Sequence, residues 1–138
     1  MKRVYVLLIV LIYISLTSYS QTKENSNHHN NIKTVDVYYF HYSHRCATCI
    51  AVEDEAVKSL KELYPVKWKA NEITFLSIDM DTNDGEELAK SMKIAGQSLI
   101  ITYNNKQEDL TNTAFLYART KPEKLKKKLK KTIDKLFK

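Results

Sequence analysis

The chain has 138 residues, 43% of them hydrophobic and 28% charged, so its composition excludes collagen-like, low-complexity and polytopic membrane proteins. It holds only two Gly, two Pro and two Cys, which excludes a disulfide-rich scaffold and disfavours a turn-dense β-sandwich. The formal net charge of +6 is concentrated in the Lys-rich last eighteen residues, so the sequence does not predict a uniformly basic nucleic-acid-binding surface.

The first twenty residues have the three parts of a secretory signal peptide. Residues 1–3 are basic at two positions, residues 4–14 form an apolar run, and residues 15–20 are small or polar. An apolar run of eleven residues is too short to span a bilayer. Ser18 and Ser20 occupy the positions that a signal peptidase reads, so we predict cleavage after Ser20 and export to a periplasmic or other extracytoplasmic space. An uncleaved N-terminal anchor is the alternative.

Residues 21–33 are polar and rich in Asn, which predicts a disordered linker before a single domain at residues 34–138. Residues 35–42 are β-branched and aromatic, as in a buried central strand. Apolar residues then recur every three or four positions from residue 49 to residue 64, which predicts a helix that Pro65 ends. A second buried strand, Ile73–Asp79, and a short helix at residues 86–92 follow.

The C-terminal third predicts a hairpin and a long amphipathic helix. Ser98–Tyr103 is the third strand, Asn104-Asn105 is a turn signal, and residues 106–110 return as an antiparallel edge strand. A helical turn is expected at residues 113–119, and residues 120–123 form a capping box that opens the last helix. The predicted buried stripe of that helix consists of Leu125, Leu129, Ile133, Leu136 and Phe137.

The element order is therefore β-α-β-α-β-β-α. We expect two right-handed βαβ crossovers to build three parallel strands, to which the hairpin adds an antiparallel edge strand. The result is an α/β fold with a mixed central sheet flanked by helices.

The two cysteines form a Cys-Ala-Thr-Cys motif at residues 46–49, where the first strand gives way to the first long helix. Backbone N–H groups and the partial positive charge at a helix N-terminus stabilise a thiolate, so we expect Cys46 to be the attacking thiol. Cys49, one turn later and more buried, would resolve a mixed disulfide. His44 and Arg45 would add positive charge near Cys46. A disulfide across one helical turn stabilises a fold weakly, so the motif favours redox or metal chemistry. Haem attachment is excluded because Ile50 follows Cys49.

The element order and the position of this motif resemble a thioredoxin fold. Three stretches also resemble the thioredoxin-like family of the nitrophenyl compound nitroreductase subunit ArsF, which is associated with arsenic-resistance gene clusters. These stretches are VDVYYFHYSHRCATCIAVEDEA, AGQSLIITYNN and LTNTAFLYARTKPEKLKKKL. The resemblance covers residues 34–137. It implies a thiol–disulfide or electron-transfer accessory protein with nucleophilic Cys46, resolving Cys49, and no cofactor besides the redox-active disulfide.

Three features depart from ordinary thioredoxin. Ala-Thr replaces Gly-Pro between the cysteines. In the loop that carries Gln97, Ser98 is expected at the position of the cis-proline opposite the active site. Phe40 is expected where thioredoxin has a buried acid beneath its cysteines. The proton acceptor for Cys49 would then be His41 or His44.

The sequence also contains His-x-x-His-x-Cys-x-x-Cys, formed by His41, His44, Cys46 and Cys49, whose side chains suit zinc, copper(I) or trivalent arsenic. A strand end and a helix start do not readily converge four side chains, so we assign no metal site. Cys46, Cys49 and His44 are kept as the alternative ligands.

We therefore predict an exported protein that exchanges thiols and disulfides, or transfers electrons, with a protein partner such as a reductase or membrane electron donor. A thiol-based metal- or arsenic-binding protein is the alternative, and a non-catalytic scaffold subunit is a third. No nucleic-acid partner is expected. The Lys residues of the last helix read as a solvated face, with docking to an acidic partner or an anionic membrane surface as the functional alternative.

Overall fold

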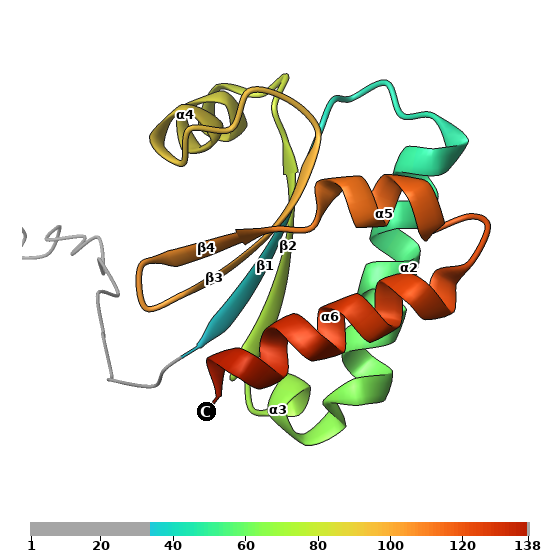
Figure 1. Ribbon diagram of the computed structural model, residues 1–138. Helices are drawn as coiled ribbons and strands as arrows, with labels where there is room; N and C mark the ends of the chain where they lie inside the picture. Colours follow the sequence, from blue (N-terminus) through green and yellow to red (C-terminus); the bar gives the residue numbers. More distant parts are fainter. Residues whose placement is uncertain (1–33, 138) are drawn as a thin grey trace, which may run out of the picture. The chain divides into compact units, whose positions relative to one another are not determined.

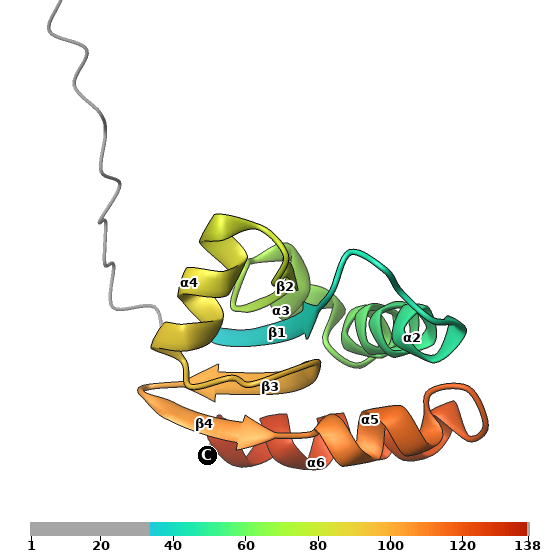
Figure 2. The same ribbon diagram turned by 90° about the horizontal axis from the view of Figure 1, so that it is seen from above.

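The computed structural model describes residues 34–137, in which four strands form one sheet. The strands are β1 (Val35–His41), β2 (Ile73–Asp79), β3 (Ser98–Tyr103) and β4 (Lys106–Asp109). Their order across the sheet is β2-β1-β3-β4, which Figure 2 shows from top to bottom. The strand β1 is parallel to β2 and antiparallel to β3, and β4 is antiparallel to β3. The mixed sheet flanked by helices is confirmed.

The predicted signal peptide and linker lie outside the described residues. Within residues 34–137, no helix has the length and apolar character that a membrane crossing requires.

The direction of β3 was predicted wrongly. We expected it to be parallel to β1, but Ser98 pairs with Phe40 at one end of the antiparallel ladder. The intervening helix α4 (Asn83–Ser91) has nine residues and rises about 14 Å, whereas a seven-residue strand spans about 23 Å. The helix therefore does not carry the chain back along the sheet, and β3 begins at the end where β2 stops.

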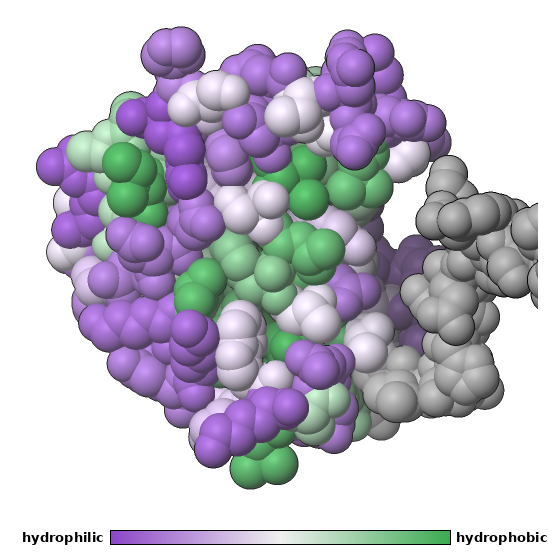
Figure 3. Space-filling view, turned by 180° about the vertical axis from the view of Figure 1, so that it is seen from behind, coloured by the Kyte–Doolittle hydropathy of each residue, from purple (hydrophilic) through white to green (hydrophobic). Residues whose placement is uncertain are grey.

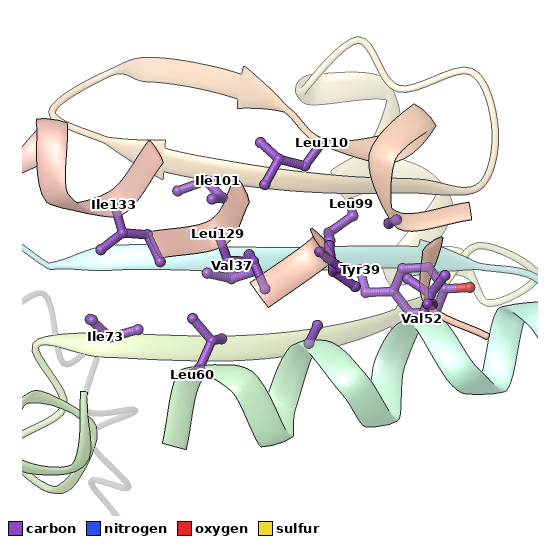
Figure 4. Packing of buried hydrophobic residues seen from close by; sticks show 14 of the residues in the cluster. Val37, Tyr39, Val52, Leu60, Ile73, Leu99, Ile101, Leu110, Leu129 and Ile133 are labelled. Carbon is purple, nitrogen blue, oxygen red and sulfur yellow. The ribbon is translucent and has the colours of Figure 1, made fainter. Parts of the chain in front are cut away.

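Three helices cover one face of the sheet (Figure 1). They are α2 (Ala47–Leu63), α5 (Thr111–Tyr117) and α6 (Pro122–Leu136). Alternate residues of β1 point into this main core, because side chains of a strand alternate between its two faces. Figure 4 shows residues of β1, β2 and β3 packed against α2 and α6. Fully buried members include Val35, Val37, Tyr39, Val52, Leu60, Leu99, Ile101, Leu125, Leu129 and Ile133.

The other face of the sheet carries α4 and a smaller core. Phe40, Met80, Ala89 and Ile100 are its buried members, with Tyr38 and four other partly buried hydrophobic residues packed against them. Figure 3 shows the molecule from behind the view of Figure 1, where hydrophobic surface gathers near the centre inside a hydrophilic rim.

Two predictions that depend on the backbone preference of single residues, the helix end at Pro65 and the turn at Asn104-Asn105, are confirmed. Pro65 ends α2, as predicted, but the chain immediately forms the five-residue helix α3 (Pro65–Lys69), since Pro is tolerated in a first helical turn. Asn104 and Asn105 have φ angles of 48° and 62°, and two positive φ angles are what a tight type I′ hairpin turn needs. The hairpin prediction is confirmed.

The capping box before α6 was predicted wrongly. The helix begins after Lys121 without a side-chain cap, and the Thr120 hydroxyl instead donates to the Leu116 carbonyl at 3.0 Å. The buried stripe of α6 is confirmed at Leu125, Leu129 and Ile133, whereas Leu136 and Phe137 are only partly buried.

Candidate functional site

Cys46 is the N-cap residue of α2. Its backbone is extended, with φ −79° and ψ 163°, and its carbonyl accepts the helical hydrogen bond from the Ile50 amide at 3.1 Å. The Cys46 sulfur accepts a hydrogen bond from the Cys49 amide at 3.4 Å. The orphan N–H groups of the first helical turn are therefore directed at this sulfur atom.

The two thiols have different surroundings although their sulfur atoms lie 2.7 Å apart. The Cys46 residue is exposed and Cys49 is 2% exposed, and neither is in a disulfide. Hydrogen bonds from the Cys49 thiol and from the Cys49 and Thr48 amides lower the pKa of Cys46. Burial, and then the hydrogen bond to Cys46, raise the pKa of Cys49. This arrangement makes Cys46 the more acidic thiol of the pair.

Gln97 supplies a second contact to the buried thiol. The Cys49 thiol donates to the Gln97 side-chain carbonyl oxygen at 3.0 Å, which joins the start of α2 to the loop before β3. The neighbouring Ser98 hydroxyl turns back to donate to the Gly96 carbonyl at 2.8 Å. All peptide bonds within residues 34–137 are trans. Gln97, rather than Ser98, therefore provides the side chain of this loop that contacts Cys49.

Tyr39, not Phe40, lies on the sheet beneath the cysteines. We placed Phe40 there, but Phe40 belongs to the smaller core on the α4 face, whereas Tyr39 packs in the main core with Val52 of α2 (Figure 4). An error of one residue along a strand moves a side chain to the opposite face of the sheet. Counting by two from buried Val35 and Val37 would have identified Tyr39.

The Tyr39 side chain is fully buried between the sheet and the start of α2. Burial, and then the interaction with Cys49, raise the pKa of Tyr39 far above its usual value, so the phenol stays neutral. The guanidinium carbon of Arg45 lies 5.5 Å from the centre of its ring. Among residues 34–137, the Tyr39 hydroxyl and the Arg45 Nε find no hydrogen-bond partner of ordinary geometry.

Arg45 faces the second turn of α2. Its guanidinium group forms an ion pair with Glu53 and donates to the Cys49 carbonyl at 3.3 Å. We expected Arg45 to act on the Cys46 thiolate, but the hydrogen bonds that lower the pKa of Cys46 come from Cys49 and backbone amides. Arg45 instead binds the first two turns of α2, through the Cys49 carbonyl and the Glu53 carboxylate.

Within residues 34–137, neither histidine predicted as a proton acceptor hydrogen bonds to Cys49. The His41 side chain is nearly buried, its Nδ1 donates to the Tyr42 carbonyl at 3.0 Å, and its Nε2 is hydrogen-bonded to the Ser77 hydroxyl at 3.0 Å. His44 is exposed in the preceding loop. In the part of the chain that the structure describes, no group of three or more His, Cys, Asp or Glu side chains is arranged to hold a metal ion.

The loop before Cys46 is fastened to the end of β2, which the sequence did not reveal. The Ser43 hydroxyl donates to the Asp79 carboxylate at 2.6 Å, and the Ser43 amide donates to the Asp81 carboxylate at 2.8 Å. The hydrogen bond from Ser43 lowers the pKa of Asp79. These contacts hold the loop that presents Cys46.

Comparison with known proteins places the fold. No family model matches this chain, and no curated protein resembles it at a significant level. The oxidised thioredoxin O2 of Arabidopsis thaliana matches with a TM-score of 0.52 at 14% identity, over 78% of this chain and 79% of that one. The germline-specific thioredoxin Deadhead of Drosophila melanogaster gives 0.49 at 23% identity, over 75% and 82%. The first match shows that the fold is thioredoxin-like.

Proposed function

We propose that this protein is a thiol–disulfide exchange protein in which Cys46 and Cys49 cycle between a dithiol and a disulfide. The observation that carries the proposal is the asymmetry of the pair. The exposed thiol has a lowered pKa at a helix N-terminus, while the buried thiol has a raised pKa and lies 2.7 Å away. An attacking thiol needs access and thiolate character, whereas a resolving thiol needs only proximity.

The reaction proceeds in two displacements. The Cys46 thiolate attacks a disulfide of the partner, a mixed disulfide forms, and one partner thiolate leaves. Cys49 then attacks the Cys46 sulfur, which forms the intramolecular disulfide and releases the second partner thiolate. Two electrons pass to the partner, and the reverse sequence returns them. The redox-active disulfide is the only redox group that this cycle requires.

The cycle is proposed to take place outside the cytoplasm with one dedicated protein partner. Export is supported by the signal-peptide pattern of residues 1–20, and a mature N-terminus at Gln21 would be its direct sign. A dedicated partner is supported by Ser98, the first residue of β3, which stands beside the site without the rigid proline that presets an extended peptide. A role as an accessory subunit in a nitroreductase or arsenic-resistance system rests on the ArsF-like segments alone.

The partner is also proposed to be acidic, or to lie at an anionic membrane surface, where it meets α6. Lys126 and Lys130 pair with Glu62 and Asp134 of this chain. The exposed Lys131 and its neighbours along the same helix leave positive charge for a partner.

The alternative function, binding of trivalent arsenic or zinc, draws on the same two thiols. Two adjacent sulfur atoms suit a thiophilic ion, but zinc normally takes four ligands, and His44 is in the exposed loop rather than part of a ligand group.

One experiment separates these functions. Reduced wild-type protein, Cys46→Ser and Cys49→Ser are mixed with oxidised glutathione in one series and titrated with arsenite or zinc in another. Exchange supports the proposal if the wild type forms the intramolecular disulfide and Cys49→Ser stops at the glutathione adduct. Tight stoichiometric binding of the ion, with no disulfide formation, would replace exchange by the alternative function.

A further inference from the structure

Among residues 34–137, two polar side-chain atoms are buried beside Cys49 without a hydrogen-bond partner. The Tyr39 hydroxyl and the Arg45 Nε are both buried, and within the described residues neither makes a hydrogen bond. A buried donor without a partner is costly, so such a group in a folded protein asks for an explanation. Both groups lie beside Cys49, the thiol that changes its charge during the proposed cycle.

We propose that the Tyr39 hydroxyl is the hydrogen-bond donor that stabilises the Cys49 thiolate when Cys49 attacks the mixed disulfide. This inference rests on the proposed redox function and adds to it a further side chain that acts on the Cys49 sulfur. In the dithiol form the one Cys49 proton has two acceptors, the Cys46 sulfur at 2.7 Å and the Gln97 side-chain oxygen at 3.0 Å. A thiolate has no proton to donate, and it becomes the acceptor that the phenol lacks.

The surroundings favour a donor rather than a base at this position. The raised pKa of Tyr39 keeps its proton on the phenol, and a hydrogen bond donated by that phenol to the Cys49 sulfur would lower the pKa of Cys49. The guanidinium group of Arg45, which pairs with Glu53, places a positive charge beside the ring of this phenol.

Two other titratable groups adjoin this pair. Cys46 hydrogen bonds to Cys49 in the dithiol form, but in the mixed disulfide its sulfur is uncharged. The ring of His41 lies 5.7 Å from that of Tyr39, with both nitrogens engaged by Ser77 and the Tyr42 carbonyl. Neither of these two groups therefore offers the Cys49 thiolate a free donor, whereas the Tyr39 hydroxyl does.

The step balances without any further reactant. Cys49 loses its proton to the partner thiolate that left in the first displacement, directly or through water. The Cys49 sulfur then bonds to the Cys46 sulfur, and the bond between Cys46 and the partner breaks. The two cysteines are oxidised and the partner disulfide is reduced by two electrons. Tyr39 keeps its proton throughout and releases its hydrogen bond once the disulfide is closed.

The test uses Tyr39→Phe, with Tyr38→Phe as a matched control. Tyr38 is the next residue on β1, is partly buried and stacks on Phe40 on the opposite face of the sheet. Reduced protein is rapidly mixed with oxidised glutathione, quenched by acid and analysed by mass spectrometry. This resolves a first phase, in which Cys46 forms the adduct, from a second phase, in which Cys49 removes it.

Only the second phase should respond to Tyr39→Phe. Loss of a hydrogen bond to a charged group changes an equilibrium about ten- to a hundredfold. The fraction of Cys49 present as thiolate should fall by that factor. A more basic thiolate is also a stronger nucleophile, which offsets part of this fall, so the second phase should slow about three- to fifteenfold at neutral pH. Its pH profile should also move to higher pH. Tyr38→Phe should change neither, and an unchanged second phase with an unchanged pH profile in Tyr39→Phe overturns the inference.

A second measurement keeps the inference separate from the redox function. In proteins that also carry Cys46→Ser, the Cys49 side chain is labelled with isotopes and titrated by NMR. Tyr39→Phe should raise the pKa of Cys49 and Tyr38→Phe should not. If the wild type forms no glutathione adduct, the proposed function fails. The titration still decides whether Tyr39 bonds to the Cys49 thiolate, and an unmoved pKa overturns the inference by itself.

Discussion

Replacing Tyr39 by Phe should make the reduced protein more stable. The Tyr39 side chain is fully buried, and within residues 34–137 its hydroxyl has no hydrogen-bond partner. Leaving such a group buried without a partner costs about 1 to 3 kcal/mol. Phe keeps the ring and the packing while it removes the oxygen atom, so it should recover most of that cost. Weak attraction between the hydroxyl, Cys49 and Arg45 places the expected gain near the lower end of the range.

Urea denaturation under reducing conditions measures this gain. For a domain of this size the free energy of unfolding falls by about 1 to 3 kcal/mol per molar urea, so the midpoint for Tyr39→Phe should rise by about 0.5 to 1 M. Tyr38→Phe, on the other face of the sheet, should stay within about 0.5 kcal/mol of the wild type. A lowered midpoint for Tyr39→Phe would mean that the hydroxyl is already satisfied in the dithiol form, and the reasoning about its role would be refuted.

Three further predictions follow from the site and its support. Cys49→Ser should accumulate a mixed disulfide between Cys46 and the partner, whereas Cys46→Ser should accumulate none, and equal capture by both variants in mass spectrometry would contradict the assigned roles. Hydrogen bonds from Cys49 and the backbone lower the pKa of Cys46, so as the pH is lowered its alkylation should continue below the pH at which Cys49, measured in Cys46→Ser, stops reacting. If Cys49 instead reacts at the lower pH, the assigned order of the two pKa values is wrong. Gly85→Ala should lower the free energy of unfolding by about 1 to 3 kcal/mol, because its Cβ would collide with the Asp79 carbonyl oxygen. Gly96→Ala, with open space around its Cβ, should stay within about 0.5 kcal/mol of the wild type. Equal urea midpoints for the two variants would show that the backbone at Gly85 shifts at little cost.

Local chemistry made part of the site readable from the sequence. The Cys-x-x-Cys spacing at a strand-to-helix junction fixes one sulfur at a helix N-terminus and the other one turn inside, so the positions of Cys46 and Cys49 followed directly. Two asparagines that tolerate positive φ angles fixed the hairpin. In each case the determinant lies within a few residues of the feature.

Features that depend on distant packing were not readable in the same way. The direction of β3 follows from how far α4 carries the chain, and the sequence pattern of a strand is the same in either direction. The choice of Tyr39 over Phe40 depends on which face of the sheet α2 covers, because both residues are buried and aromatic but point to opposite faces. The contact from Gln97 to Cys49 joins residues 48 positions apart, which only the folded sheet brings together.

Measuring the equilibrium between the dithiol and the disulfide is the most direct test of whether Cys46 and Cys49 form a reversible redox pair. Protein is incubated in buffers of reduced and oxidised dithiothreitol that span a range of potentials, and free thiols are then alkylated and counted by mass. We expect one reversible transition of the Cys46–Cys49 pair, with a tenfold change in the ratio of the two forms for about 30 mV, as a two-electron couple requires. Cys46→Ser should show no such transition. If the wild type stays reduced throughout, or oxidises only by linking two chains, these cysteines are not an exchange site.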